Sequence, residues 1–311
     1  MGRRIRIWEE NSMHHVTLNC VDRMFLLKPS KEVKNIIGAS LGRALTQHPI
    51  MLHSVTTNIN HMELIFSIGK GQTDNVSQFL REFAGLAARE FNRFYKREGH
   101  FWSGRARIEE ITSDNKAEKL LGYGACNVVK DGLVEKASDW KGLSSTKVLS
   151  FGGKLKFTYI NRTLWWKKGA KTKDVAPSEY TRETEIILHP LPAWVKLSLS
   201  SRQTRFCEIV QNHEEQAKLE RKKEGITSVK GMSKINRLSP FSKPSSPRKR
   251  TVQPLCHADT QKEYKLYKEK YKGVVQEHQK ASIAFRTGHL DVEFPPGTFR
   301  PPLITVQKHI T

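Results

Sequence analysis

His61 and Glu63 stand two residues apart in the apolar stretch "NINHMELIF", which spans residues 58–66. Successive side chains of a strand point to opposite faces, so we expect His61 and Glu63 to share one face while the apolar residues around them point the other way. An imidazole and a carboxylate side by side suit a divalent ion, and the carboxylate favours Mg²⁺ or Mn²⁺. Two ligands are too few for a metal site, so another element must supply the rest.

A helix predicted over residues 114–129 offers candidates for completing this site. Tyr123 and Asn127 are four residues apart and therefore share a face of the helix, with Lys119 one turn earlier. Gly122 and Gly124 flank the tyrosine, although each costs roughly 1 kcal/mol of helix stability relative to alanine. Without side chains at these two positions, another backbone or a DNA strand could approach the tyrosine ring closely.

Together these residue types describe a reaction that cleaves a phosphodiester. A divalent ion acts as a Lewis acid on the scissile phosphate, and the phenol oxygen of Tyr123 attacks phosphorus to form a covalent phosphotyrosine. Because the bond energy is kept, another strand can be joined later. Each residue also has a plainer interpretation: His61 as a structural histidine, Tyr123 as part of a core, and Glu63 as the partner of an arginine.

The elements that would position these residues alternate between strand and helix patterns. The patterns predict strands over residues 14–21, within 50–68 and over 105–112, and helices over 29–48, 73–95 and 114–129. Asn115 and Glu118 are spaced as in a capping box at the start of the last helix. This order predicts an α+β fold, in which helices pack against one face of an antiparallel sheet and leave the other face free for His61 and Glu63.

The charge of the chain points to an anionic partner. The net charge is +22, with 22 Lys and Arg against 16 Asp and Glu in residues 1–150, and 31 against 15 in the remainder. Such an excess is typical of proteins that bind nucleic acid. We expect the second half to hold the partner rather than to carry the chemistry; a basic surface that only maintains solubility is the alternative.

Cysteine usage and the absence of targeting signals predict a cytoplasmic protein. The four cysteines form no C-x-x-C pair, which argues against a zinc knuckle and favours free thiols in a reducing compartment. The start "MGRRIRIWEENS" has no apolar region behind it, so it is not a secretory signal. No stretch approaches the roughly 18 apolar residues that a membrane span needs.

The composition changes after Ser145 and suggests four regions. These are a first domain over residues 1–146, a basic accessory region over 147–225, a flexible Ser/Pro/basic linker over 226–256 and a mostly helical C-terminal extension over 257–311. The second half has few apolar residues, so we expect it to pack partly on the first. Trp165 and Trp166 either stack on unpaired bases or form a small core, and "SPRKR" over 246–250 either grips DNA or is a solvated charge run.

Five segments resemble, in order, the motifs of a known family. "RRIRI…HHVTLNCVDRMFLL" resembles its opening strand and turn, "NHMELIF" its N-H-x-H-L metal strand, "GHFWSGRARIEEI" its G-x-x-W-x-G-R strand, "LLGYGACNVVKDGLV" its tyrosine helix, and "DWKGLSS" its W-x-x-S-S tail. Over residues 1–146 the sequence thus resembles the REP-associated tyrosine transposase group of the single-tyrosine HUH transposases. "FRTGHLDVEFPPGTFRP" is similar to the end of a longer subgroup that carries a C-terminal extension.

This resemblance implies a ferredoxin-like sheet, usually dimeric, that acts in DNA transposition. Such proteins bind hairpin-forming single-stranded DNA and cleave and rejoin it through a covalent 5′-phosphotyrosine. The resemblance places Tyr123 on the nucleophile, His61 on the first metal histidine and Asn127 on the helix residue that completes the Mg²⁺ or Mn²⁺ site. The residues expected to bind DNA are Arg105 and Arg107 on the basic strand, Lys119 and Arg23.

Two residues depart from the family pattern. Glu63 stands at the second metal histidine, and Val128 replaces the proline that follows the helix asparagine. A glutamate can bind Mg²⁺ or Mn²⁺ through oxygen, so a site of His61, Glu63 and Asn127 stays feasible, but its added charge opposes an approaching phosphate. One alternative is therefore a DNA-binding protein that kept the fold and lost the chemistry. A structured-RNA binder is another, although the aromatic RNP signature is missing.

Overall fold

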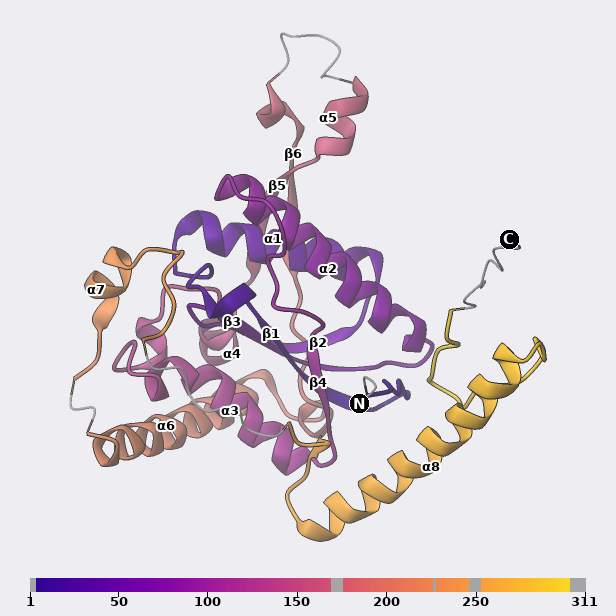
Figure 1. Cartoon of the computed structure of the whole chain (residues 1–311). Helices are drawn as coiled ribbons and strands as arrows, with labels where there is room; N and C mark the ends of the chain where they lie inside the picture. Colours follow the sequence, from indigo (N-terminus) through magenta and orange to yellow (C-terminus); the bar gives the residue numbers. More distant parts are fainter. Residues whose placement is uncertain (1–3, 169–175, 226–227, 246–252, 303–311) are drawn as a thin grey trace.

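The first half of the chain folds into an antiparallel sheet with two helices on one face (Figure 1). The computed structural model describes residues 4–168, 176–225, 228–245 and 253–302. The elements run in the order β1 (Met13–Asn19), α1 (Lys31–Gln47), β2 (Met51–Thr57), β3 (His61–Ser67), α2 (Thr73–Phe94) and β4 (Arg107–Ile111). Their strands lie side by side as β2-β3-β1-β4. This βαββαβ topology is ferredoxin-like, and it confirms the predicted α+β class.

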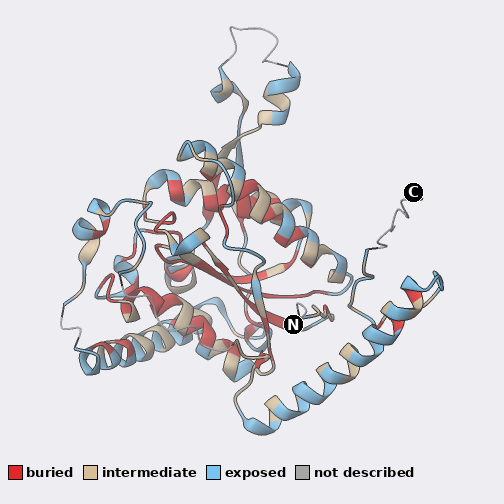
Figure 2. Ribbon diagram, viewed as in Figure 1, coloured by how far each residue is buried: buried red, intermediate tan, exposed pale blue. Residues whose placement is uncertain are grey.

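Strand β3 has the alternation predicted from its sequence. Met62, Leu64 and Phe66 are fully buried in the core that the sheet shares with α1 and α2, whereas Ile65 belongs to a second core on the opposite face. In Figure 2 the buried colour accordingly appears on the sheet and on the helices to both sides of it. His61 and Glu63 alternate with the first set, so they share the second face, as predicted.

Helices also cover this second face, which the sequence had suggested would be left free. Helix α3 (Asp114–Lys130) lies across it, and α6 (Leu199–Lys223) packs against α3 from outside. Apolar residues such as Ile65 and Ile111 on this face require a cover, which α3 provides. The α3 cap also differs from the prediction: Ser113 accepts a hydrogen bond from the Lys116 backbone N–H, and Asn115 lies inside the helix.

The second half packs on the first, as its shortage of apolar residues predicted. After α4 (Thr146–Phe151), strands β5 (Leu155–Ile160) and β6 (Thr181–Ile186) form a two-stranded antiparallel sheet against α1. Phe157 of β5 lies directly over Gly38. Between these strands α5 (Arg162–Lys168) projects from the body in Figure 1. Trp166 on α5 is 70% exposed, so the core interpretation of this tryptophan is wrong.

The last part of the chain returns to the sheet. It contains α7 (Gly231–Arg237), β7 (Cys256–His257) and α8 (Gln261–Arg286), and β7 pairs in parallel with β4 to extend the sheet. Helix α8 runs along the outside with only Ala281 and Phe285 buried (Figure 2). The predicted linker thus includes a helix, while its run "SPRKR" lies outside the described residues. The four proposed region boundaries stay predictions.

The described residues were also compared with the expectations on cysteines and membrane spans. Cys20, Cys126, Cys207 and Cys256 are free thiols, and Cys207 is the exposed one among them. No helix within the described ranges is both long and apolar enough to cross a membrane.

Candidate metal and tyrosine site

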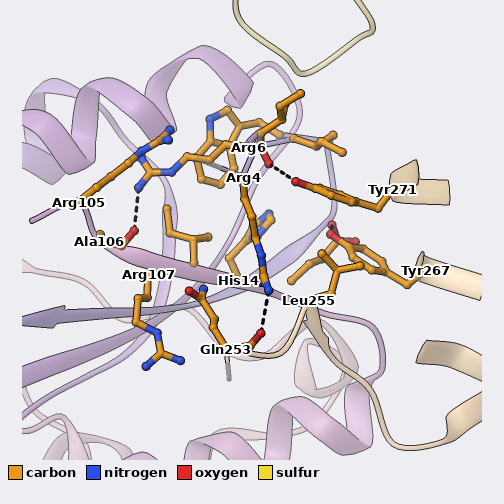
Figure 3. Close-up of a pocket in the computed structure, with 15 residues that line it drawn as sticks. Arg4, Arg6, His14, Arg105, Ala106, Arg107, Gln253, Leu255, Tyr267 and Tyr271 are labelled. Carbon is orange, nitrogen blue, oxygen red and sulfur yellow. Dashed lines mark hydrogen bonds between the residues drawn. The ribbon is translucent and has the colours of Figure 1, made fainter. Parts of the chain in front are cut away.

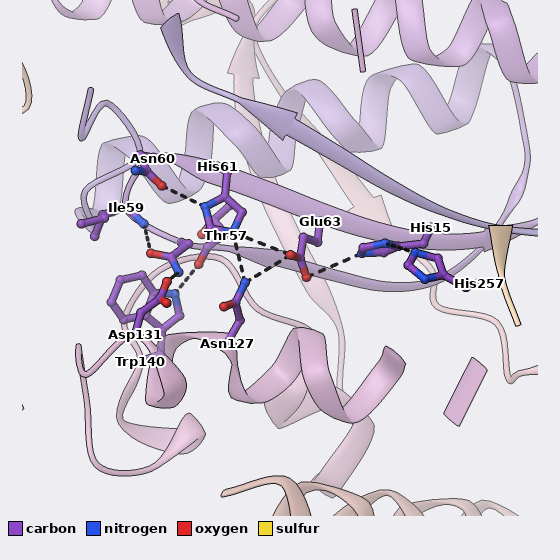
Figure 4. A network of polar contacts seen from close by, with 11 residues as sticks. His15, Thr57, Ile59, Asn60, His61, Glu63, Asn127, Asp131, Trp140 and His257 are labelled. Atoms are coloured by element: carbon purple, nitrogen blue, oxygen red, sulfur yellow. Dashed lines mark hydrogen bonds and ion pairs between the residues drawn. The ribbon is translucent and has the colours of Figure 1, made fainter. Parts of the chain in front are cut away.

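Three side chains from β3 and α3 converge on the second face of the sheet (Figure 4). The Asn127 Nδ2 lies 3.1 Å from His61 Nε2 and 3.1 Å from Glu63 Oε1. The two β3 side chains are themselves close, because His61 Nε2 lies 3.7 Å from Glu63 Oε1. The structure therefore brings together the three residues that the sequence predicted as metal ligands, although they lie up to 66 positions apart.

The spacing of these three groups suits a small divalent ion. In an octahedral Mg²⁺ site with ligand bonds of about 2.1 Å, neighbouring ligand atoms are about 3 Å apart. The Asn127 amide can present its oxygen in place of its nitrogen after a half-turn of the amide plane. His61 is held from behind, because its Nδ1 lies 2.9 Å from Asn60 Oδ1. One nitrogen and two oxygen donors fit Mg²⁺ or Mn²⁺.

Glu63 is an anion that is almost fully enclosed. It is 9% exposed. Burial alone raises the pKa of this carboxyl, but the contacts with His15 and His61 outweigh burial and hold the pKa well below its ordinary value. Among the described groups its Oε2 has no hydrogen-bond partner, and His15 Nε2 lies 3.7 Å from it. The direction of this shift favours the ionised form of Glu63, which suits a residue that binds a cation.

Helix α3 is pressed between the sheet and α6, and its glycines permit this. A Cβ at Gly122 would lie 2.6 Å from Ile209 Cγ2 of α6 and would also overlap His213. At Gly124 a Cβ would meet Glu63 Oε2 at 3.5 Å, an ordinary contact. The space that glycine leaves at position 122 is therefore filled by side chains of α6 and not by DNA. This contact fixes the helix that carries Tyr123 and Asn127.

Tyr123 lies one turn before Asn127 and lines the same cleft as the three converging side chains. This cleft measures about 810 Å³. The Lys130 Nζ lies 5.7 Å from the centre of the Tyr123 ring, within the range of a cation–π contact. The cationic residues that line the cleft are Arg23, Arg107, Lys116, Lys130 and Lys230, against the acidic residues Glu63, Glu109 and Asp131. The chemistry-bearing residues are thus gathered in an open and mostly basic groove.

The four residues predicted to bind DNA occupy different places. Arg23 and Arg107 line the cleft. Arg105 lines a neighbouring pocket of about 290 Å³, which it shares with Arg107 (Figure 3). Lys119 is not among the residues that line the cleft; its Nζ lies 2.8 Å from Asp259 Oδ1.

The neighbouring pocket is strongly basic and is completed by the second half of the chain. Arg4, Arg6 and Arg105 come from the first half, and Gln253, Tyr267 and Tyr271 are among the residues that close it from the second (Figure 3). Burial, helped by the charge of Arg105, lowers the pKa of Arg6 to about 9. An anion placed here would relieve the repulsion between these guanidinium groups.

Three further residues of the cleft were not singled out in the sequence. His15, Glu109 and His257 come from β1, β4 and β7, and His15 Nδ1 lies 3.2 Å from His257 Nε2 (Figure 4). Alternation within β4 could have indicated Glu109, since it shares a strand face with Arg107. Nothing local in the sequence marks His257, because 242 residues separate it from His15.

The solved structures that are similar to this chain include two that are described as transposases. The chain matches no protein-family model and no curated protein. It is similar to a REP-associated tyrosine transposase bound to a REP hairpin, at 20% identity over 47% of this chain and 82% of the other, with a TM-score of 0.40. It is also similar to a provisionally named transposase from Deinococcus radiodurans R1, at 16% identity over 40% and 93%, with a TM-score of 0.29. Similarity this low does not establish a shared function, which must follow from the residues themselves.

Proposed function

We propose that this chain is a transposase-like enzyme that cleaves and rejoins single-stranded DNA through a covalent 5′-phosphotyrosine. Tyr123 is the nucleophile, and His61, Glu63 and Asn127 hold Mg²⁺ or Mn²⁺. The observation that supports this most is the convergence of three donor groups on one face of the sheet, one helical turn from a tyrosine that lines the same cleft. When bound, the ion supplies Lewis-acid polarisation of the scissile phosphate.

The chain's own residues account for the remaining chemistry. The Tyr123 oxygen forms a bond to phosphorus while the bond from phosphorus to the 3′ oxygen breaks. The phenol loses one proton and the departing 3′ oxygen gains one, so the products are a 5′-phosphotyrosine and a free 3′-hydroxyl. The Lys130 Nζ lies 5.7 Å from the centre of the Tyr123 ring and adds a positive charge beside the position where the scissile phosphate must bind. Rejoining is the reverse reaction with a second 3′-hydroxyl.

DNA binding is assigned to the basic cleft and the neighbouring pocket. Arg23 and Arg107 flank the site, and Arg4, Arg6 and Arg105 continue the positive surface next to it. Guanidinium groups bind phosphate through paired hydrogen bonds, so this surface suits the backbone of a hairpin stem whose single-stranded flank enters the cleft. A homodimer, as the sequence resemblance implies, is compatible with this assignment but is not required by it.

The test is cleavage of a labelled hairpin oligonucleotide with a single-stranded flank, in the presence of Mn²⁺. Wild-type protein is expected to give a shorter labelled strand and a protein–DNA adduct that survives denaturation. Tyr123→Phe should give neither product, because its ring lacks the attacking oxygen. Tyr180→Phe, which alters a tyrosine far from the cleft, is the matched control and should cleave as wild type does. Unchanged cleavage by Tyr123→Phe would show that the mechanism is wrong.

A second candidate function is hairpin binding without cleavage, and Glu63 is the observation that favours it. Its buried carboxylate stays ionised, so it repels an incoming phosphate as well as a developing tyrosinate. A protein of this kind binds the hairpin with a steep salt dependence and forms no adduct with either metal. Glu63→His, which restores the family residue, should then create cleavage where the wild type has none; if wild type already cleaves, this alternative is rejected.

A further inference from the structure

A second group of potential metal ligands lies beside the proposed site. One ligand atom from each of His15, Glu109 and His257 can be chosen so that all three lie within 4.8 Å of one another. His15 and Glu109 are 6% and 2% exposed and sit opposite each other in the pairing of β1 with β4. His257 comes from the C-terminal extension and reaches this face because β7 pairs with β4.

The distances fit a tetrahedral transition metal. With zinc–nitrogen bonds of about 2.0 Å, two nitrogen ligands of a tetrahedral ion are about 3.3 Å apart. His15 Nδ1 and His257 Nε2 are 3.2 Å apart. Two imidazoles and a carboxylate form a common zinc ligand set that leaves a fourth position for water.

Charge also supports a cation at this point. Glu109 is buried, and its Oε1 forms an ion pair at 3.3 Å with Nη2 of Arg107, a side chain that is 43% exposed. Glu63 Oε2 lies nearby against His15 and lacks a hydrogen-bond partner among the described groups. A solvent-screened arginine balances the charge of the buried Glu109 only in part, so a cation bound beside this carboxylate would be favoured.

We propose that His15, Glu109 and His257 form a second metal site, which binds a transition-metal ion of the Zn²⁺ class and fastens the C-terminal extension to the sheet. It is separate from the Mg²⁺ or Mn²⁺ site of the proposed function, and it stands whether or not the chain cleaves DNA.

Glu63 links the two sites. His15 Nδ1 faces His257, and its other ring nitrogen, Nε2, faces Glu63 Oε2. Metal-bound histidines usually donate their second ring N–H to a carboxylate, which fixes the orientation of the imidazole. Glu63 therefore directs Oε1 toward His61 and Asn127 and Oε2 toward His15. A histidine at position 63 could not serve both sides in this way, which gives the departure from the family pattern a physical role.

The second site would strengthen a weak attachment. Strand β7 contains only Cys256 and His257, and so short a strand contributes little stability by itself. An ion that joins β7 to β1 and β4 adds a cross-link across 242 residues of chain.

Zinc content measures this proposal directly. The full chain is dialysed against limiting Zn²⁺ in buffer with excess Mg²⁺, and bound zinc is counted by elemental analysis. Wild type should retain about one zinc per chain. His257→Gln should retain less than a tenth of that, because it removes a partly exposed ligand without emptying a core position. His289→Gln, an exposed histidine of the same extension, is the matched control and should retain the wild-type amount.

His61→Ala separates the two sites. It should keep its zinc if the ion is held by His15, Glu109 and His257, even if all DNA cleavage is lost. Zinc retained by a folded His257→Gln would overturn the proposal. If His61→Ala lost its zinc at the same time, the ion would belong to the first site instead. Folding is checked by circular dichroism, and His15→Gln provides a second ligand variant. Co²⁺ gives an independent reading, since the strong visible absorption of a tetrahedral Co²⁺ site should be absent in both ligand variants.

Discussion

Replacing Gly122 by alanine tests whether contact with α6 holds α3 in its place. The new methyl group would lie 2.6 Å from Ile209 Cγ2 and would overlap His213. Overpacking of this kind typically costs about 1–3 kcal/mol. Alanine also gains about 1 kcal/mol of helix propensity over glycine, so the stability of Gly122→Ala alone would combine two opposing effects.

Gly124→Ala removes this ambiguity because it lies in the same helix and gains the same propensity. Its methyl group would meet Glu63 Oε2 at 3.5 Å, which needs no rearrangement. The free energy of unfolding should therefore be lower for Gly122→Ala than for Gly124→Ala by about 1–3 kcal/mol. Urea unfolding of both variants, followed by tryptophan fluorescence and circular dichroism, measures the difference.

The cleavage assay adds a functional reading of the same pair. A shift of α3 away from α6 moves Tyr123, and a displacement of about 1 Å can reduce a rate roughly 100-fold. Gly122→Ala should then cleave more slowly than its stability alone explains. Equal unfolding free energies for the two variants would refute the idea that α6 sets the position of α3.

Three further predictions address the fold and the binding surface. Burial lowers the pKa of His53 from 6.5 to about 4. The stability that neutral His53 contributes is therefore complete above pH 6.5 and is lost as the pH falls toward 4. Between pH 7 and pH 5 the free energy of unfolding in urea should fall by roughly 2 kcal/mol more for wild type than for His53→Gln. A Cβ at Gly297, where φ is +73°, would overlap the Trp8 backbone, so Gly297→Ala should speed proteolysis after α8. Arg23→Gln should lower the slope of log K for hairpin DNA against log salt by about one, whereas Lys119→Gln should leave it unchanged.

Controls make these three results specific. His289→Gln alters an exposed histidine and should show the pH response of wild type. Gly288→Ala has a similar backbone strain, with φ at +108°, but its methyl group meets no atom within 4 Å; proteolysis as fast as in Gly297→Ala would show that strain rather than the Trp8 contact is responsible. If Arg23→Gln and Lys119→Gln reduced the slope of log K against log salt equally, DNA would not bind specifically in the cleft.

Local sequence patterns predicted the parts of the site that depend on the period of one element. Alternation in β3 placed His61 and Glu63 on one face, and the four-residue spacing in α3 placed Tyr123 and Asn127 together. The structure confirms both placements, because a strand or a helix fixes the direction of its side chains wherever it is packed.

The features that sequence missed depend on contacts between distant segments. His257 joins His15 only because the two-residue strand β7 pairs with β4, and no periodic pattern marks so short a strand. The ion pair of Lys119 was missed as well, because Asp259, which lies 2.8 Å from its ammonium group, belongs to the extension. The second helical layer was missed for the same reason, since α6 and α3 lie far apart in the chain.

The pairing of β7 with β4 has a consequence for synthesis of the protein. An uncovered edge strand offers free N–H and C=O groups to any other extended chain. The partner of Thr112, at the end of β4, is His257, which is 145 residues later in the chain. At a translation rate of about 5–20 residues per second, the β4 edge stays open for about 7 to 30 s while the rest of the polypeptide emerges. During that interval the charged side chains of β4, Arg107, Glu109 and Glu110, oppose pairing of this edge with the sheet of a neighbouring chain.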